Sequence, residues 1–194
     1  MPRPSYQVDR DRPSHQRLLL PSSQQVAALR KQDESWYMLP DEGDDGINYL
    51  DFRVEIEAPD FYTVDPTPPS SATAGVDARA ASASRRELPY KGGVFSVQLT
   101  FSEAYPAEPP AVRFQTRIWH PQVHLPDGKP CVDVLSKGWG PAKTLRDVLD
   151  TLRQLIAEPS STDSVNTEAA AELADGLEKF EQHAREVTRA FAIT

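Results

Sequence analysis

The sequence has little cysteine and little positive charge. Cys131 is the only cysteine among 194 residues, so the chain can form no internal disulfide, and no cysteine and histidine cluster has zinc-site spacing. Lysine and arginine number 21 against 29 acidic residues, a net charge of −8 that argues against a general nucleic-acid binder, which needs a basic surface. The sequence also lacks an 18-residue apolar run and a secretory leader. We therefore expect a cytoplasmic or nuclear protein that binds no nucleic acid, membrane or metal.

Two segments lack the large apolar side chains that a packed core needs. Residues 1–21 contain four arginines and four prolines, and residues 59–88 consist largely of Pro, Ser, Ala, Thr and Arg. Such segments bury too little apolar surface to offset the entropy lost on ordering. We predict a flexible N-terminal arm over 1–21 and a core domain over 22–194, interrupted by a disordered insertion at 59–88.

Alternating apolar residues predict three strands. The alternation runs over residues 50–56, then over 95–101, and then over 112–119 after the motif "YPAEPP". Because proline cannot donate to a strand ladder, Pro109 and Pro110 mark the turn before the last strand. Three strands that follow one another in sequence indicate an antiparallel meander.

Helical spacing is found on both sides of these strands. Ser22 and Gln25 fit a capping box that begins a helix extending to about Trp36. Thr144 and Asp147 fit a second capping box, followed by a broad apolar face.

The C-terminal part of the chain continues this pattern. The dipeptide Glu158-Pro159 is expected to end the helix that begins at the second capping box. Apolar residues then recur every three or four positions over 166–191, which predicts one last helix whose apolar stripe is buried. Strands followed by helices indicate an α+β domain.

Cys131 itself admits more than one interpretation. A free cysteine is most often a small buried hydrophobe. Yet the preceding segment 121–130 holds three prolines and a glycine, and irregular backbone of this kind often carries functional groups. A hydrolase in which His120 or His124 takes the thiol proton is disfavoured, because such partners normally come from distant segments. The residues alone leave a reactive and an inert cysteine both open.

The order of motifs around this cysteine resembles that of ubiquitin-conjugating enzymes. The runs "YKGGVF", "YPAEPPAVRF", "RIWHPQ", Cys131, "GWGPAKTLRDVLDTLRQL" and "EPSSTDSVNTEAAAEL" follow one another from Leu50 onward, the insertion excepted. The resemblance implies an α+β ubiquitin-conjugating fold, an antiparallel meander sheet with an N-terminal helix and C-terminal helices. It implies an enzyme that carries ubiquitin or a related modifier as a thioester on its cysteine and yields it to a lysine amine or a ligase cysteine. Such an enzyme needs no cofactor, because the upstream activating enzyme uses the ATP.

The resemblance also implies the catalytic residues. The family's His-Pro-Asn motif, whose asparagine supports the loop and stabilises the oxyanion, falls on residues 120–122 with Gln122 in place of asparagine. The gap from this motif to Cys131 is one residue longer than is common in the family. The acidic residue that positions the incoming lysine falls on Asp163, and Asp133 matches another frequent acidic position, although both carboxylates could be solvated loop charges. The predicted catalytic residues are Cys131, Gln122, Asp163, His120 and Asp133.

Partner surfaces follow from the same resemblance. Ligases bind the family through the first helix, the "YPxxPP" loop and the Trp-x-Pro-Ala loop, and the activating enzyme meets a basic face of the first helix. The extended arm offers apolar anchors to a groove of the activating enzyme, unless it is merely a disordered tail. The predicted contacts are Pro106, Ala107, Trp139, Pro141 and Ala142 for the ligase, and Arg30, Lys31 and Leu19 for the activating enzyme.

Within the family, the branch that charges the cullin modifier is the most similar. The stretches "YLDFRVEIEAPD", "IWHP", "GWGPAKTLRDV" and "EAAAEL" and the extended arm carry this similarity. It implies a monomeric neddylation enzyme that works with a RING-type or related ligase on a cullin-like substrate. Two alternatives stay open: a ubiquitin-conjugating enzyme with a divergent motif, and a binding module whose chemistry is impaired by Gln122 and the longer loop.

Overall fold

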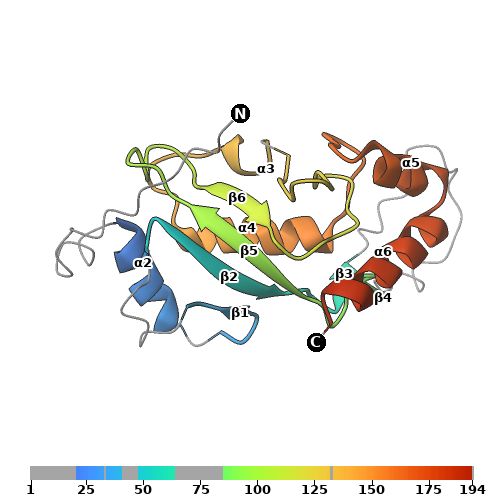
Figure 1. The fold of residues 1–194 in the computed structure, drawn as a ribbon, viewed down its shortest axis with the longest axis horizontal. Helices are drawn as coiled ribbons and strands as arrows, with labels where there is room; N and C mark the ends of the chain where they lie inside the picture. Colours follow the sequence, from blue (N-terminus) through green and yellow to red (C-terminus); the bar gives the residue numbers. More distant parts are fainter. Residues whose placement is uncertain (1–20, 33, 41–47, 64–84, 132, 194) are drawn as a thin grey trace, which may run out of the picture.

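The core of the fold is a four-stranded antiparallel sheet. The computed structural model describes residues 21–32, 34–40, 48–63, 85–131 and 133–193, so the predicted arm with Leu19 lies outside the described residues. The strands lie in the order β1 (Tyr37–Met38), β2 (Asp51–Glu57), β5 (Val94–Thr100) and β6 (Ala111–Phe114). Helices pack against this sheet (Figure 1), which confirms the α+β class.

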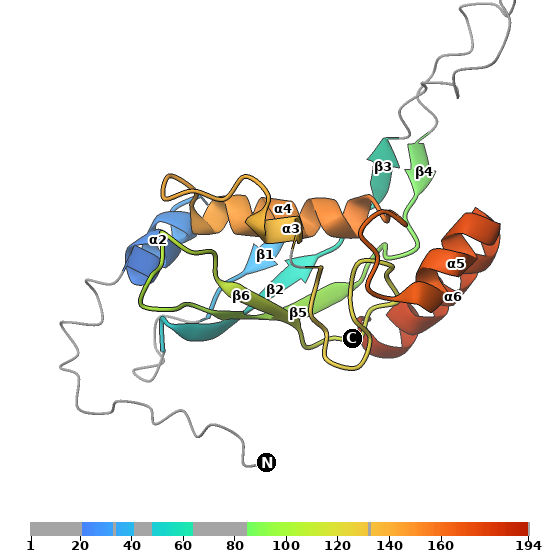
Figure 2. The same cartoon turned by 90° about the horizontal axis from the view of Figure 1, so that it is seen from above.

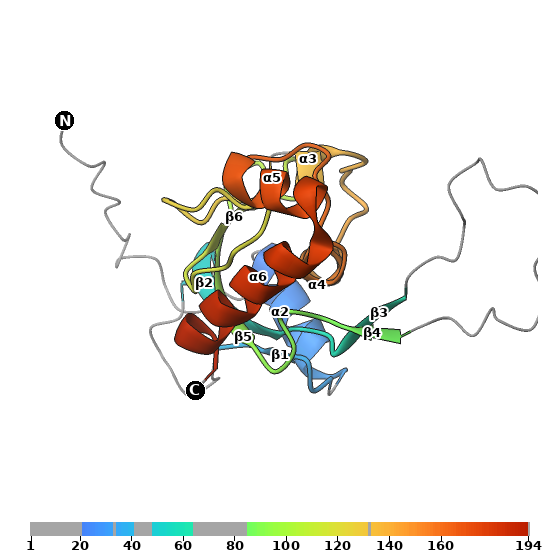
Figure 3. The same ribbon diagram turned by 90° about the vertical axis from the view of Figure 1, so that its right-hand side faces the viewer.

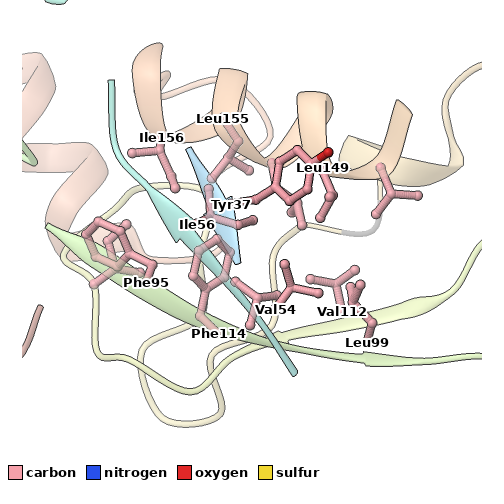
Figure 4. Packing of buried hydrophobic residues seen from close by; sticks show 14 of the residues in the cluster. Tyr37, Val54, Ile56, Phe95, Leu99, Val112, Phe114, Leu149, Leu155 and Ile156 are labelled. Carbon is pink, nitrogen blue, oxygen red and sulfur yellow. The ribbon is translucent and has the colours of Figure 1, made fainter. Parts of the chain in front are cut away.

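The alternation seen in the sequence places one face of the sheet in the core. Every second residue of β2 is buried, and β2 pairs with β5 in a register that sets Val54 opposite Val97. These side chains meet Leu149 and Ile156 of helix α4 (Leu145–Ala157) in one apolar cluster (Figure 4). Burial of this face against α4 removes apolar surface from water and so stabilises the domain.

The strand predictions were right in place but wrong in number and extent. Strand β1 was missed, because two residues are too few to show an alternation. The last strand ends at Phe114 rather than near Trp119, because Gln115 and Thr116 donate their backbone N–H groups to Ser96 and turn the chain. Ile118 and Trp119 are still buried, so their apolar character reflects packing rather than a strand.

Helix α4 begins where the sequence predicts. The Thr144 side chain accepts from the Asp147 N–H, and the Asp147 carboxylate accepts from the Thr144 N–H at 2.8 Å. The helix ends before Glu158, as expected for a residue that precedes proline. It lies across one face of the sheet, between α2 (Pro21–Arg30) at one end and the C-terminal helices at the other (Figure 2).

The N-terminal helix is shorter than predicted. It starts at Pro21 and ends at Arg30, so Ser22 lies inside it rather than at its cap, and Trp36 lies beyond it. The Gln25 side chain does not cap this helix. Its Oε1 accepts from the Tyr105 hydroxyl and from the Leu145 N–H. Gln25 therefore ties this helix to the 105 loop and to α4 instead of capping its own first turn.

The single C-terminal helix expected over 166–191 is two helices. Helix α5 (Thr167–Asp175), capped by Asn166, and helix α6 (Leu177–Phe191) are separated at Gly176, and they pack together at the end of the sheet away from α2 (Figure 3). The expected stripe is buried at its centre, but Phe191 at its end is 53% exposed and its ring lies under the Arg117 guanidinium. The apolar spacing in the sequence runs on through Gly176, so it does not reveal the break between the two helices.

Short strands lie at both ends of the predicted insertion. Strands β3 (Phe61–Thr63) and β4 (Arg85–Glu87) pair as a separate antiparallel ribbon that points away from the main sheet (Figure 2). The prediction of disorder from 59 to 88 was therefore too wide at both ends, and Leu88 is buried. Residues 64–84 lie outside the described residues.

Replacing Thr144 with alanine tests the cap of α4. Thr144→Ala removes the side-chain acceptor for Asp147 N–H, so the free energy of unfolding should fall by about 1 kcal/mol in denaturant titrations. The matched control is Thr167→Ala, an exposed first-turn threonine of α5, whose cap is supplied by Asn166. Equal losses in the two variants would contradict the assignment of the cap to Thr144.

Candidate active site

The loop between β6 and helix α3 (Asp133–Ser136) is folded back against the sheet edge. Gly128 has a φ of 68°, and a Cβ at this position would lie 2.0 Å from the Phe114 carbonyl oxygen, so the close approach requires glycine. The Gly128 carbonyl in turn accepts from Phe114 N–H at 2.8 Å. Val123 and Pro130 face each other as an isolated antiparallel bridge, which carries the chain directly to Cys131.

Cys131 lies at the end of this bridge and is half-buried. Its backbone N–H donates to the Gln122 carbonyl at 2.8 Å, so the structure brings together two predicted catalytic residues that are nine positions apart in sequence. The Gln122 side chain is also half-buried. Cys131 thus lies on irregular backbone and is partly exposed, which favours the reactive interpretation over an inert core residue.

The His120 side chain is buried beneath the loop that leads to Cys131 and does not face solvent. Its ring is fully buried, with Nε2 3.0 Å from the Leu155 carbonyl and Nδ1 accepting from the Gln122 N–H at 3.1 Å. These partners require a neutral ring protonated at Nε2, and burial lowers the pKa of His120 to about 4. His120 is therefore a positioning residue for Gln122, and its ring offers no free nitrogen to take a proton from the thiol.

Tyr90 buttresses the residue before His120. The Tyr90 hydroxyl donates to the Trp119 carbonyl at 2.6 Å, and burial raises the pKa of Tyr90 well above its usual value, which keeps this donor protonated. Its ring also packs 5.9 Å from the His120 ring. Tyr90, which lies in the "YKGGVF" run, therefore supports the loop that leads to Cys131.

The loop after α4 is hydrogen-bonded to the segment that leads to Cys131. Val165 N–H and Asn166 N–H both donate to the Pro121 carbonyl at 2.9 Å, one residue from Gln122. This loop carries Asp163, which is exposed and adopts a φ of 55° in the left-handed region. The Asp163 carboxylate pairs with the Lys137 ammonium at 3.0 Å. The structure thus connects the predicted acidic residue to the cysteine loop through backbone hydrogen bonds.

For Asp133, the remaining predicted catalytic residue, the structure describes the backbone alone. Asp133 is the first residue of α3, two positions after Cys131. Its role stays a prediction.

The predicted ligase surface is brought together by Trp139. Its indole N–H donates to the Pro106 carbonyl at 3.0 Å, which joins the two loops that the resemblance assigns to ligase binding. Ala107, Pro141 and Ala142 are exposed around this contact. Their exposure leaves apolar side chains available on one surface, although their binding role stays a prediction.

The two basic residues assigned to the activating enzyme lie at the end of α2. Arg30 is half-buried, and its guanidinium donates to the Pro40 carbonyl. Lys31 is exposed directly after the helix. Only Lys31 is therefore presented fully to solvent.

One cluster behind the loop was not found from the sequence. The Trp119 indole N–H donates to the Glu172 carboxylate at 2.9 Å, and the His183 ring stacks on Trp119 with a centroid distance of 3.8 Å. His183 also lies 3.2 Å from the same carboxylate. The three residues come from the loop after β6, from α5 and from α6, and no local pattern in the sequence links segments so far apart.

The described part of the chain holds no group of three or more histidine, cysteine, aspartate or glutamate side chains that could bind a metal ion. Among the described helices, none is long and apolar enough to cross a membrane.

Comparisons with known proteins agree on one family. The sequence profile described as "Ubiquitin-conjugating enzyme" matches residues 75–188. The chain is 39% identical to Protein PEROXIN-4 of Arabidopsis thaliana over 108 residues, which are 55% of this chain and 69% of that protein. It is 35% identical to Ubiquitin-conjugating enzyme E2 27 of the same plant over 54% of this chain and 54% of that protein. It is 39% identical to Ubiquitin-conjugating enzyme E2-22 kDa of Drosophila melanogaster over 55% of this chain and 53% of that protein. The matches thus span only about half the length of these last two relatives.

A solved structure of a ubiquitin conjugating enzyme has the same fold as this chain. The E2 domain of a Toxoplasma gondii ubiquitin conjugating enzyme superposes with a TM-score of 0.65 at 25% identity. The superposition covers 88% of this chain and 96% of that domain. The four-stranded sheet and its flanking helices are therefore those of the expected fold.

The burial of His120 predicts how stability depends on pH. An imidazole with a usual pKa of 6.5 takes up a proton in the unfolded chain below that pH, whereas the folded ring stays neutral until about pH 4. The free energy of unfolding should therefore be fully retained above pH 6.5 and fall between pH 6.5 and 4, by about 1 kcal/mol per pH unit from this residue.

Denaturant titrations over this range, with nitrogen NMR shifts of the imidazoles, measure both quantities. His120→Gln removes the titrating group and should flatten this part of the slope, even though the variant is less stable. A His120 ring that titrates near its usual pKa of 6.5 in the folded protein would contradict the assignment.

Proposed function

Since the chain belongs to the ubiquitin-conjugating enzyme family, we propose that Cys131 accepts a ubiquitin-type modifier as a thioester and passes it to a lysine amine. The observation that carries this proposal is the half-buried thiol at the end of the 123–130 bridge, bonded through its backbone to Gln122. Loading exchanges one thioester for another. The Cys131 thiolate attacks the carbonyl of the modifier's thioester on the activating enzyme, and that enzyme's thiolate leaves.

Transfer to lysine then places charge next to Gln122. The amine attacks the thioester carbonyl, the carbonyl oxygen becomes an oxyanion, and the Cys131 thiolate leaves as the amide forms. Both backbone polar groups of Gln122 are already used, since its N–H donates to His120 and its carbonyl accepts from Cys131. Only its side-chain amide can donate to the oxyanion, so the positioning of this backbone by His120 matters for the chemistry.

Asp163 is proposed to hold the incoming lysine. Its carboxylate is exposed on a loop that two hydrogen bonds tie to Pro121, so it stands beside the cysteine loop without being part of it. A carboxylate can orient an ammonium before it loses its proton. Asp133, at the start of α3, is the second candidate for this role.

The partners follow from the same proposal. An activating enzyme supplies the charged modifier at the end of α2, near Arg30 and Lys31, and it also uses the ATP, so this chain needs no cofactor. A RING-type or related ligase binds the surface around Trp139. The enzyme works as a monomer in the cytoplasm or the nucleus.

Two modifiers are supported by different observations. The names of two relatives, "Ubiquitin-conjugating enzyme E2 27" and "Ubiquitin-conjugating enzyme E2-22 kDa", favour ubiquitin. The similarity of "YLDFRVEIEAPD" and "GWGPAKTLRDV" to enzymes that charge the cullin modifier favours neddylation, with a cullin-like substrate. We place ubiquitin first, because the relatives match over more than half of the chain, whereas the neddylation similarity rests on short stretches.

A charging assay tests the thioester and the modifier together. The protein is incubated with ATP and with either the ubiquitin or the cullin-modifier activating enzyme and its modifier, then analysed by electrophoresis with and without reductant. An adduct that reductant cleaves is expected with ubiquitin, and Cys131→Ala should abolish it. Charging by the cullin modifier alone would reverse the choice of modifier. Modifier binding without any adduct would show an impaired binding module instead.

Substitution of Gln122 tests its role in transfer. Gln122→Ala should slow discharge of the thioester to free lysine by about 10²-fold, because the oxyanion loses its side-chain donor. The measurement is single-turnover discharge of an enzyme that has already been charged, so a defect in loading does not contribute. Gln122→Asn, which keeps the amide on a shorter stem, is the matched variant and should retain much more activity than alanine. Equal rates for alanine and glutamine would contradict the oxyanion role.

A further inference from the structure

A hollow of about 460 Å³ lies between the end of β6 and the folded-back loop that leads to Cys131. Residues 113–118 form one wall and residues 123–128 form the other, and we call this site the arginine hollow after Arg113 and Arg117. We propose that the arginine hollow binds an acidic peptide segment of the acceptor substrate, which flanks the lysine that receives the modifier. This inference rests on the proposed function, because it requires an acceptor at Cys131.

The two arginines reach the arginine hollow through the strand and the turn that follows it. Residues of β6 alternate between exposed and buried, so Arg113 points away from the core. Arg117 follows the turn whose backbone N–H groups donate to the Ser96 carbonyl. The Arg117 guanidinium lies 5.5 Å from the centroid of the Phe191 ring, and a guanidinium held over a ring keeps N–H groups that can donate to a carboxylate.

Neither arginine has an acidic partner in the part of the chain that the structure describes. Both are exposed, and neither forms an ion pair or a hydrogen bond with a described carboxylate. By contrast, Arg146 pairs with Glu34 at 2.7 Å and Arg185 pairs with Glu181 at 2.9 Å. In a chain with a net charge of −8, this concentration of positive charge is a local exception, and it attracts a negatively charged ligand.

The opposite wall supplies apolar surface and one acidic residue that is already bound. Asp127, the only acidic residue among those that line the arginine hollow, lies 2.7 Å from His124 Nδ1 and 3.3 Å from Lys129 Nζ. Its carboxylate is therefore not the partner of the two arginines. Leu125 is half-buried and Pro126 is exposed on the same wall, so a bound segment also meets apolar side chains.

The arginine hollow is close to the proposed acceptor position. Val123 lines it and faces Pro130 across the isolated bridge, and Pro130 immediately precedes Cys131. Paired residues of antiparallel strands lie about 5 Å apart and consecutive residues about 3.8 Å, so the Cα atoms of Val123 and Cys131 are within about 9 Å. An extended peptide covers this separation in about three residues, so acidic side chains about three to six residues from the acceptor lysine reach the arginines.

Charge and position together identify the occupant. Guanidinium groups match the two oxygens of a carboxylate, and glutamate and aspartate side chains supply carboxylates on a peptide. Such binding acts before the chemistry, because it raises the local concentration of the acceptor lysine and does not touch the thioester. Arg113 and Arg117 are therefore specificity-determining residues, which lower the concentration of acceptor needed for transfer and leave the maximal rate unchanged.

Peptide acceptors test this preference. The charged enzyme is mixed with an excess of a peptide that has one lysine, a short glycine and serine spacer, and two glutamates, and the matched peptide has glutamines in place of the glutamates. The glutamates precede the lysine in one pair of peptides and follow it in a second pair. In at least one pair, we expect half-maximal discharge at an about tenfold lower concentration of the acidic peptide, with the same maximal rate. The preference should shrink at high salt, because exposed ion pairs are screened.

Paired substitutions locate the preference in the arginine hollow. Arg113→Gln with Arg117→Gln removes both guanidinium groups and should bring the ratio of the two half-maximal concentrations from about ten to about one. The matched control is Arg53→Gln with Arg189→Gln, which removes two exposed cations of β2 and α6 outside the arginine hollow and should keep the ratio near ten. Because the readout is a ratio measured on one preparation, an altered stability or loading of a variant cancels.

A titration without the thioester tests binding separately. The uncharged protein, labelled with nitrogen-15, is titrated with a lysine-free version of the acidic peptide. The amide NMR shifts of residues 113–118 and 123–128 should change, and the glutamine version of the peptide should leave them unchanged.

Three results would overturn the inference although the thioester forms: equal half-maximal concentrations for the acidic and neutral peptides in both pairs, a ratio that persists without the two arginines, or shift changes that lie away from the arginine hollow. Absence of any thioester would instead overturn the proposed function, and the titration would then still show whether the arginine hollow binds an acidic segment.

Discussion

The buried ring of His120 joins the helix that covers the sheet to the backbone that presents the cysteine. One nitrogen meets the Leu155 carbonyl near the end of α4, and the other accepts from the Gln122 N–H, whose own carbonyl receives the Cys131 N–H. Because the ring is fully buried, its charged form is strongly disfavoured and the neutral form keeps this geometry over the physiological range. The proposed reactive group, Cys131, is therefore positioned by the apolar core, although it lies on a loop.

A second set of contacts fixes the loop from the C-terminal side. The Pro121 carbonyl accepts two N–H groups from the segment that leads into α5, and Asn166 both donates there and caps that helix. Trp119 reaches the same pair of helices through Glu172 and His183. Helices α5 and α6 do not cover the main apolar face as α4 does, and their contribution to the site is to hold these partners in place.

The sequence was most informative where a pattern is local. Alternation located β2 and β5, and the capping box located the first residue of α4, because each depends on neighbours a few positions apart. Ser22 and Gln25 fit a capping box equally well, yet a long-range partner, the Leu145 N–H, takes the Gln25 side chain. The bonds of Cys131 to Gln122 and of Lys137 to Asp163 join residues 9 and 26 positions apart, which no periodicity encodes. Family resemblance proposed the members of the site, and only the folded chain shows how they are connected.

If Asp163 receives the acceptor lysine, as proposed, the weakness of its pairing with Lys137 bears on how an acceptor is chosen. An exposed carboxylate attracts any lysine, and here it attracts one from the same chain, so it cannot by itself distinguish a substrate. Selection must then come from surfaces that bring the right lysine close for long enough to displace Lys137. The Trp139 contact with Pro106 joins the two loops of the proposed ligase surface, and Gln25 connects that region to α2. The chemistry at Cys131 can stay unselective, because effective concentration supplied by binding elsewhere decides which amine reacts.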